Sequence, residues 1–199
     1  RVDTGFNPEQ LLSLEYRLPR NQYPDGEQQW RFHYQVGDRV RALPGVVSAS
    51  NIMALPYSGN GSTGTFVVPG MDVAADHEPR AQYNIVDPHY FETIDIPAIA
   101  GRGISYQDQP DGLPVAVINR TMAERYWPDD DPIGRQVILR RLFTRGGEDV
   151  TMTVVGVVGN IKHRRLDEPE MPQMYLPYTQ HPHLFSTLVV RTKGDPMSM

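Results

Sequence analysis

The first fifty residues carry patterns typical of a strand, a helix and a second strand. Residues 12–18 (LSLEYRL) place apolar side chains at every second position, which is the period of a half-buried strand. Apolar or small residues then recur at helical spacing: Trp30, Tyr34, Gly37 and Val40. Asp25, with Gln28 three residues later, forms an N-terminal capping pair, and Pro-Gly at 44–45 ends the helix. Residues 46–53 read as a strand, so the opening unit is predicted to be β-α-β.

The middle of the chain predicts short strands separated by turns. Residues 54–64 (ALPYSGNGSTG) have the composition of a loop, and 65–68 and 81–86 read as short strands around a polar bend. Asp-Pro opens a short helix over about 87–93. The Gly-Arg-Gly run at 101–103 implies a turn or a bulge.

The last third continues with strands and one more short helix. Residues 115–118 read as a strand, and Asn119 can cap a helix that turns Met122, Ala123 and Tyr126 inward before Trp-Pro ends it. Residues 150–158 are apolar on both faces, as expected of a central strand. Further extended segments, after a turn at Pro132 and Gly134, are 137–139, 174–176 and 187–191. The whole pattern predicts an α+β fold.

Composition narrows the classes of function. The 199 residues include no cysteine, which removes disulfides, thiolate nucleophiles and cysteine metal sites. The net charge of −5 gives no overall field for nucleic acid, so no nucleic-acid partner is expected. Local basic groups are interpreted as solvated faces: Arg140, Arg141, Arg145, Lys162, His163, Arg164 and Arg165.

The chain reads as a piece of a longer protein. No apolar run approaches the roughly 20 residues of a membrane span, and no signal peptide opens the sequence. Arg1 does not look like a natural start. We therefore expect the chain to be cut from a larger one.

Two glycine-rich motifs are interpreted as loop. Residues 59–64 spell GxGxxG, but a dinucleotide fingerprint needs a helix after it, and Thr65-Phe66-Val67-Val68 is strand-like. The same stretch misses a GxSxG nucleophile elbow, because Asn60 stands at the first glycine position.

The candidate metal ligands form no complete set. Aligned as a calcium loop from Asp129, the Asp129-Asp130-Asp131 run places Ile133 and Arg140 where oxygen ligands are needed. His181 and His183 share one face if extended and could both reach a zinc ion, with His163 as a spatial third ligand. We predict no metal site and no cofactor. The remaining histidines are expected to be solvated or hydrogen-bonded: His33, His77 and His89.

No catalytic residue is predicted. Paired carboxylates for acid–base chemistry need burial or convergence in a cleft. The four considered are interpreted as solvated loop residues: Asp108, Asp111, Glu168 and Glu170. Trp30 and Trp127 are expected in the core or between subdomains.

Four segments together carry a family resemblance. They are HYFETIDIPAIAGRGI, VAVINRTMAERYWPDDDPIGRQV, VVGVVGNIKHRRLDEPEMPQMYLPY and LVVRTKGDP. GFNPEQLLSLEYRLP and RVRALPGVVSA match more loosely. In this order they resemble the extracytoplasmic core domain of MacB-like and FtsX-like ABC transporter permeases, and most closely a duplicated subgroup without a fused ATPase domain.

The resemblance implies a porter-like β-α-β subdomain into which a mostly β subdomain with short helices is inserted. Residues 1–57 plus 186–199 would be the porter-like part, and 58–185 the insertion. In the family the porter-like part continues with another helix and strand. We expect it here to be incomplete, or completed by another copy.

The function that the resemblance implies is non-catalytic. Such a domain lies on the periplasmic face of the bacterial inner membrane, tethered by flanking transmembrane helices. It couples the cycle of a separate cytoplasmic ATPase subunit to export of an envelope substrate or to mechanical signalling, with a periplasmic protein or a second permease copy as a further partner. The alternative is an extracytoplasmic binding module for a peptide, lipid or lipoprotein, using the loop at 54–64 or an exposed strand edge. A third hypothesis, a hydrolase, requires at least three histidines and acids to converge in one cleft.

Overall fold

The computed structural model describes residues 7–56, 62–71, 78–140, 148–161 and 169–194. The helices in this part are α1 (Gly26–Arg41), α2 (Tyr90–Ile94) and α3 (Arg120–Tyr126). The strands are β1 (Leu11–Arg17), β2 (Val46–Ile52), β3 (Ser62–Val67), β4 (Arg80–Val86), β5 (Ala98–Gly101), β6 (Val115–Asn119), β7 (Gln136–Leu139), β8 (Val150–Val158), β9 (Gln173–Pro177) and β10 (Phe185–Thr192). The predicted α+β class, a mixed sheet with few helices, is confirmed.

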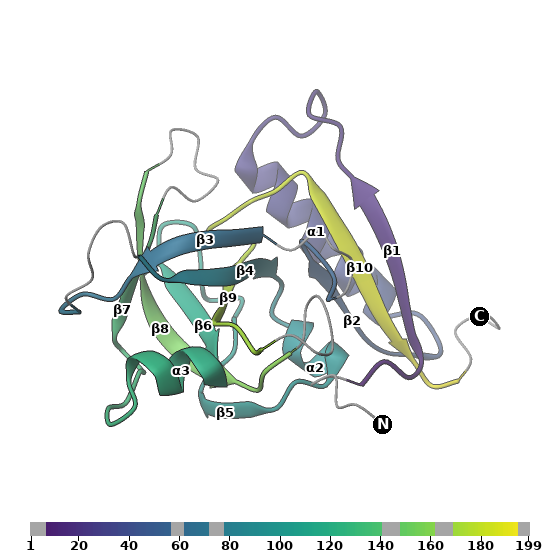
Figure 1. Cartoon of the computed structure of the whole chain (residues 1–199). Helices are drawn as coiled ribbons and strands as arrows, with labels where there is room; N and C mark the ends of the chain where they lie inside the picture. Colours follow the sequence, from purple (N-terminus) through teal and green to yellow (C-terminus); the bar gives the residue numbers. More distant parts are fainter. Residues whose placement is uncertain (1–6, 57–61, 72–77, 141–147, 162–168, 195–199) are drawn as a thin grey trace.

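The strands form two hydrogen-bonded groups that share one sheet (Figure 1). The first, here called the three-stranded sheet, has the order β1-β10-β2 with antiparallel pairs. The second, here called the ring, runs β4-β3-β7-β8-β6-β9 and closes because β9 also pairs with β4 in parallel. The two groups join where Ile52 of β2 pairs with Val86 of β4.

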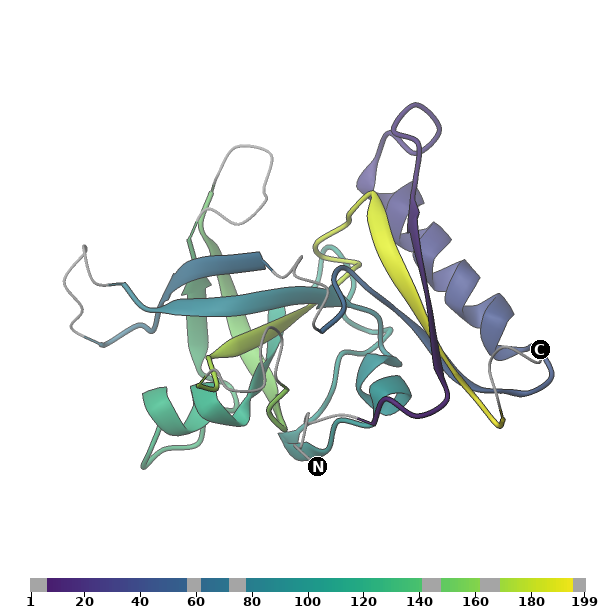
Figure 2. The same cartoon turned by 45° about the vertical axis from the view of Figure 1, so that its right-hand side comes forward.

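Three hydrophobic clusters hold these layers together. The cluster inside the ring takes every second residue of its strands, for example Tyr83 and Ile85 of β4, and α3 adds Met122 to it. A second cluster packs α2 between the three-stranded sheet and the ring. A third lies between α1 and the three-stranded sheet, which α1 covers on one side (Figure 2).

The predicted β-α-β opening is confirmed, with its caps. The Asp25 carboxylate accepts a hydrogen bond from the Gln28 backbone N–H at 2.8 Å, and α1 ends before Gly45, whose φ of +84° a glycine tolerates best. Asn119 caps α3 in the same way, accepting from the Met122 backbone N–H at 3.0 Å.

The burial expected for the first strand is only partly confirmed. Leu18, just beyond β1, is buried, but Leu12 is 39% and Leu14 is 60% exposed. They pair with Val190 and Leu188 of β10, so they lie on the α1 side of the sheet. Because β1 is the edge strand, the helix covers their neighbours in β10 but not these two leucines.

Two further expectations are corrected in the middle of the chain. Residues 62–64, predicted as loop, belong to β3, since their backbones pair with β4. The short helix begins at Tyr90 rather than at Asp87. The turn or bulge expected at 101–103 is supported by the φ of +66° at Gly101, while the register shift between β5 and β8 lies just before it, between Ala98 and Ala100. β8 is a central strand as predicted, between β6 and β7.

Candidate functional site

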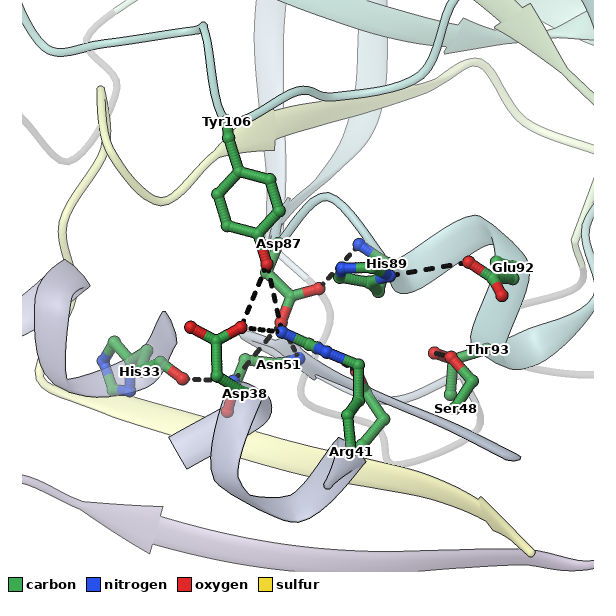
Figure 3. A network of polar contacts seen from close by, with 11 residues as sticks. His33, Asp38, Arg41, Ser48, Asn51, Asp87, His89, Glu92, Thr93 and Tyr106 are labelled. Atoms are coloured by element: carbon green, nitrogen blue, oxygen red, sulfur yellow. Dashed lines mark hydrogen bonds and ion pairs between the residues drawn. The ribbon is translucent and has the colours of Figure 1, made fainter. Parts of the chain in front are cut away.

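Polar side chains meet where the three-stranded sheet joins the ring (Figure 3). They come from α1, β1, β2, β10 and the segments after β4, β5 and β9, and they are called the junction network here. Its members are Tyr16, His33, Asp38, Arg41, Asn51, Asp87, Tyr106, Tyr178 and Ser186.

Asn51 lies at the centre of the junction network and is fully buried. Its side-chain N–H group donates to the His33 backbone carbonyl at 2.7 Å and to Asp87 Oδ2 at 3.3 Å. Its side-chain oxygen accepts from the hydroxyls of Tyr16, at 2.8 Å, and Ser186, at 3.3 Å. One amide therefore links α1, β1 and β10 to the residue that follows β4.

Asp87 is a buried carboxylate with an exposed fraction of 1%. Desolvation raises its pKa to about 6, although hydrogen bonds from the backbone N–H groups of Asn51 and His89 and the positive charge of Arg41 oppose the rise. The Asn51 N–H donates to it at 2.7 Å and the His89 N–H at 3.0 Å. These bonds fix the end of β4, which belongs to the ring, to β2.

The hydroxyl hydrogen of Tyr16 lies between two acceptors, one of them on His33. His33 Nε2 lies 2.7 Å from the His183 carbonyl oxygen, which can only accept, so this nitrogen carries a hydrogen. Burial lowers the pKa of His33 to about 4, so the ring is neutral at pH 7 and its Nδ1 accepts from the Tyr16 hydroxyl at 2.7 Å. The single Tyr16 hydrogen therefore faces both His33 and Asn51.

Arg41 closes the solvent side of the junction network. Its guanidinium donates to the Ala49 carbonyl, to Asp38 and to the Tyr106 hydroxyl, the last at 3.0 Å. Tyr106 belongs to the segment after β5, and its hydroxyl also donates to Asp38 at 3.3 Å. This contact ties the end of α1 to the ring side of the molecule.

The arrangement is suited to holding the two groups of strands together rather than to chemistry on a substrate. His33, Asn51, Asp87 and Ser186 are each at most 1% exposed, and each is hydrogen-bonded. A buried, hydrogen-bonded network is costly to break, because any lost partner leaves a desolvated polar group. The junction therefore resists relative movement of the three-stranded sheet and the ring.

The second half of the glycine-rich motif lies in a strand, not in the expected loop. Residues 62–64 pair with β4, while 59–61 lie outside the described residues. The strand following the motif is confirmed as β3. No helix N-terminus is placed there to receive a pyrophosphate, so the dinucleotide interpretation loses its support.

The candidate metal ligands do not gather among the described residues. No group of three or more histidine or acidic side chains suited to a metal occurs in that part of the chain. Asp131 caps its own turn by accepting from the Ile133 N–H at 2.9 Å, and Asp130 pairs with Arg135 at 3.3 Å. His163 lies outside the described residues, so the three-histidine arrangement is not tested.

The histidines occupy different environments. The His183 ring stands edge-on to Phe185, with the ring centroids 4.0 Å apart. Desolvation lowers the pKa of His181 to about 4, and its Nε2 is buried without a hydrogen-bond partner among the described residues. His89 faces Glu92 at 3.5 Å, and His77 lies outside the described residues.

Asp108 corrects the expectation of a solvated loop residue. It is 5% exposed, and Arg102 binds both of its carboxylate oxygens, at 2.9 and 2.7 Å. The Ser105 N–H donates to it at 2.8 Å. Asp111 is exposed as expected, and Glu168 lies outside the described residues.

The last candidate side chains are structural or solvated. Exposed Glu170 accepts from Asn160 and from Thr121, the latter at 3.3 Å. Trp127 is buried in the ring cluster and Trp30 packs against it, which confirms the core expectation. Arg140 pairs with Glu78 and Asp149, whereas the other basic residues noted from the sequence lie outside the described part: 141, 145 and 162–165.

No local sequence pattern predicted the junction network. Asp87 was expected to open a helix and His33 to be an isolated side chain. A signal was present at Asp87, which directly follows the apolar pair Ile85-Val86, where a polar residue must be partnered if it is buried.

Comparison with known proteins gives one family match. The model of the MacB-like periplasmic core domain family matches residues 8–197. Comparison with curated proteins found no match. In the described part of the chain, no helix is both long and apolar enough to cross a membrane.

Two solved structures share the fold. The periplasmic region of MacB from Actinobacillus actinomycetemcomitans gives a TM-score of 0.59 at 14% identity, covering 96% of this chain and 78% of that one. The extracellular domain of the noncanonic ABC-type transporter YknZ from Gram-positive bacteria gives 0.56 at 15% identity, covering 92% and 84%. At these identities the structures establish likeness of fold.

Proposed function

Because this chain belongs to the MacB-like periplasmic core domain family, we propose that it passes ATPase-driven movement of membrane helices to the envelope as one rigid unit. The family match makes it a periplasmic core domain of an ABC transporter permease. The proposed part is the coupling: a separate cytoplasmic ATPase drives the transmembrane helices, and the domain turns that motion into export of an envelope substrate or into a mechanical signal.

The observation that carries the proposal is the junction between the three-stranded sheet and the ring. A domain can transmit displacement only if its parts do not slide against each other. Here the sheet is continuous through the Ile52–Val86 pair, and buried Asn51 binds elements of both groups of strands. Packed, hydrogen-bonded junctions have few alternative arrangements, so we expect the domain to move as a whole.

Spin labels test this rigidity, because the 199 residues contain no cysteine that would compete for the label within the domain. The labels are attached at Arg39→Cys and Glu124→Cys, two exposed positions. Arg39 lies on α1, which packs on the three-stranded sheet, and Glu124 lies on α3, which packs on the ring. In the full permease with its ATPase, pulsed electron paramagnetic resonance should give one label–label distance that ATP binding does not change. Asn51→Ala should broaden that distribution. A nucleotide-dependent shift in the domain without that substitution would contradict the rigid-unit proposal.

We also propose the division into a porter-like part, residues 1–57 plus 186–199, and an insertion, residues 58–185. A further helix and strand of the parent protein would complete the porter-like part, as the resemblance implies. Two features support this: β1 is an edge strand, and exposed Leu12 and Leu14 form an apolar face beside α1 that a second helix could cover.

Leu14→Ala tests the completion of the porter-like part. In the 199-residue chain the leucine is 60% exposed, so its removal should change the free energy of unfolding by about 0.5 kcal/mol or less. In the longer parent periplasmic region, where the leucine would be covered, the same change should cost about 2–3 kcal/mol. Equal small effects in both proteins would remove the support for a covering helix.

A further inference from the structure

A cavity of about 360 Å³ lies on the face of the three-stranded sheet opposite α1. Its walls come from β1, β10 and the two residues after β2. They include Glu15, Arg17, Met53, Ala54, Phe185 and Thr187. The register places Glu15 opposite Thr187 and Arg17 opposite Phe185, so these four side chains share one face of the sheet. The volume is within the usual range for sites that bind small molecules.

The floor of the cavity is apolar and fixed in position. Met53 and Ala54 are each only 3% exposed. Ala54 is held from both sides by Asn84 of β4: its N–H donates to the Asn84 side-chain oxygen at 3.1 Å, and its carbonyl accepts from the Asn84 amide at 2.6 Å. Phe185 is 39% exposed and lines the cavity, where a bound apolar group could contact it.

The rim carries one charge of each sign. Glu15 and Arg17 are exposed, and neither forms an ion pair or a side-chain hydrogen bond within the described residues. They stand two residues apart on one strand, which separates their backbone positions by about 7 Å. A ligand with a cation and an anion at that separation would pair with both.

We propose that this cavity binds a short zwitterionic peptide of about two residues with apolar side chains. Its ammonium group would pair with Glu15, its carboxylate with Arg17, and its side chains would contact Met53, Ala54 and Phe185. Two extended residues span about 7 Å, which matches the spacing of the charged pair, whereas the charges of a free amino acid are much closer together. Polyanions are disfavoured because Glu15 repels them.

The occupant would touch both groups of strands. Tyr16 and Ser186 also line the cavity, and their hydroxyls bind Asn51 on the other side of the sheet. Ala54 is fixed to β4 of the ring, while Arg17 and Phe185 belong to the three-stranded sheet. Binding would therefore stabilise the junction, by mass action on the folded state. This inference does not depend on the coupling role proposed above.

The test is a calorimetric and NMR titration of the chain with the dipeptide Leu-Phe. We expect saturable binding below about 1 mM, with amide shifts confined to β1, β10 and residues 53–54. N-acetyl-Leu-Phe lacks the ammonium group, Leu-Phe-amide lacks the carboxylate and Gly-Gly lacks the apolar side chains. Each should bind about three- to tenfold more weakly than Leu-Phe.

Paired variants assign the two charges. Glu15→Gln should weaken the binding of Leu-Phe and abolish the preference of the chain for Leu-Phe over N-acetyl-Leu-Phe. Arg17→Gln should weaken it too and abolish the preference for Leu-Phe over Leu-Phe-amide. Arg39→Gln removes an exposed cation on α1, which covers the other side of the sheet, and should leave affinity unchanged. No binding at about 5 mM Leu-Phe, equal binding of the capped peptides, or equal weakening by Arg39→Gln would each overturn the proposal.

Discussion

Replacing Asn51 by aspartate tests the junction network with almost no change in shape. The substitution exchanges the side-chain N–H group for an oxygen. That group now donates to the His33 carbonyl at 2.7 Å and to Asp87 Oδ2 at 3.3 Å. In Asn51→Asp two carboxyl groups would face each other at the position of the second bond, in a site where both residues are at most 1% exposed.

Two buried carboxylates at this separation cannot both ionise, so the folded protein retains one proton on the pair. An unfolded aspartate releases that proton near pH 3.9. The unsubstituted fold already holds one proton on Asp87 to about pH 6. If the folded pair holds its proton to about pH 8, the cost of the substitution relative to the unsubstituted chain grows by about 1.4 kcal/mol for each pH unit above 6, or about 1.4 kcal/mol at pH 7. Loss of the bond to the His33 carbonyl adds about 1 kcal/mol at every pH.

The sign of the pH effect is specific. Because the folded pKa lies above the unfolded one, the destabilisation grows as the pH rises and shrinks on acidification. Urea unfolding at pH 5, 6, 7 and 8, with stability compared with the unsubstituted chain at each pH, isolates the new pair from other titrating groups. Asn51→Ala, which adds no charge, is the control and should cost about 2–3 kcal/mol at all four values. An Asn51→Asp cost that does not change with pH would refute the proposed geometry of Asn51 and Asp87.

Three other predictions concern single sites. In acid-unfolding curves, Asp87→Asn should make the loss of stability on acidification steeper, by up to about 1.4 kcal/mol per pH unit between pH 6 and 4. In the unsubstituted chain the raised pKa of Asp87 offsets the lowered pKa of His33 over this range. An unchanged slope would contradict this prediction. Asp108→Ala should cost about 2–3 kcal/mol in urea unfolding, because the Arg102 guanidinium and the Ser105 N–H lose a buried acceptor, and a cost below about 0.5 kcal/mol would show the pair to be dispensable. Gly156→Ala should cost more than about 3 kcal/mol, because its Cβ would lie 1.9 Å from the Arg102 carbonyl oxygen, while Gly194→Ala, with no atom within 4 Å, should be neutral; similar melting temperatures for the two variants would contradict the packing of β5 on β8.

Local patterns predicted most of the elements. The cap at Asp25, the stop at Gly45 and the cap at Asn119 are decided by neighbouring residues, and the structure confirms all three. The β-branched run at 150–158 predicted a central strand, and β8 does lie between β6 and β7, although the first half of the strand is buried on one face only.

Long-range arrangement could not be predicted in the same way. The alternation at 12–18 specifies a strand but not that it lies at an edge, so the exposure of Leu12 and Leu14 depends on the position of α1. The junction network joins residues as far apart as Asn51 and Ser186, which no local pattern relates. The cavity likewise needs the β1–β10 register, which brings Arg17 beside Phe185.

The central claim is that ATP binding in the cytoplasm displaces this domain relative to the membrane. The most direct measurement is energy transfer from a dye at Glu124→Cys to acceptors in the lipid surface of a nanodisc that holds the full permease and its ATPase subunit. The account predicts a transfer efficiency that changes between the nucleotide-free and ATP-bound states and does not change with an ATPase subunit unable to bind ATP. The same efficiency in both nucleotide states, with a functional ATPase present, would contradict it.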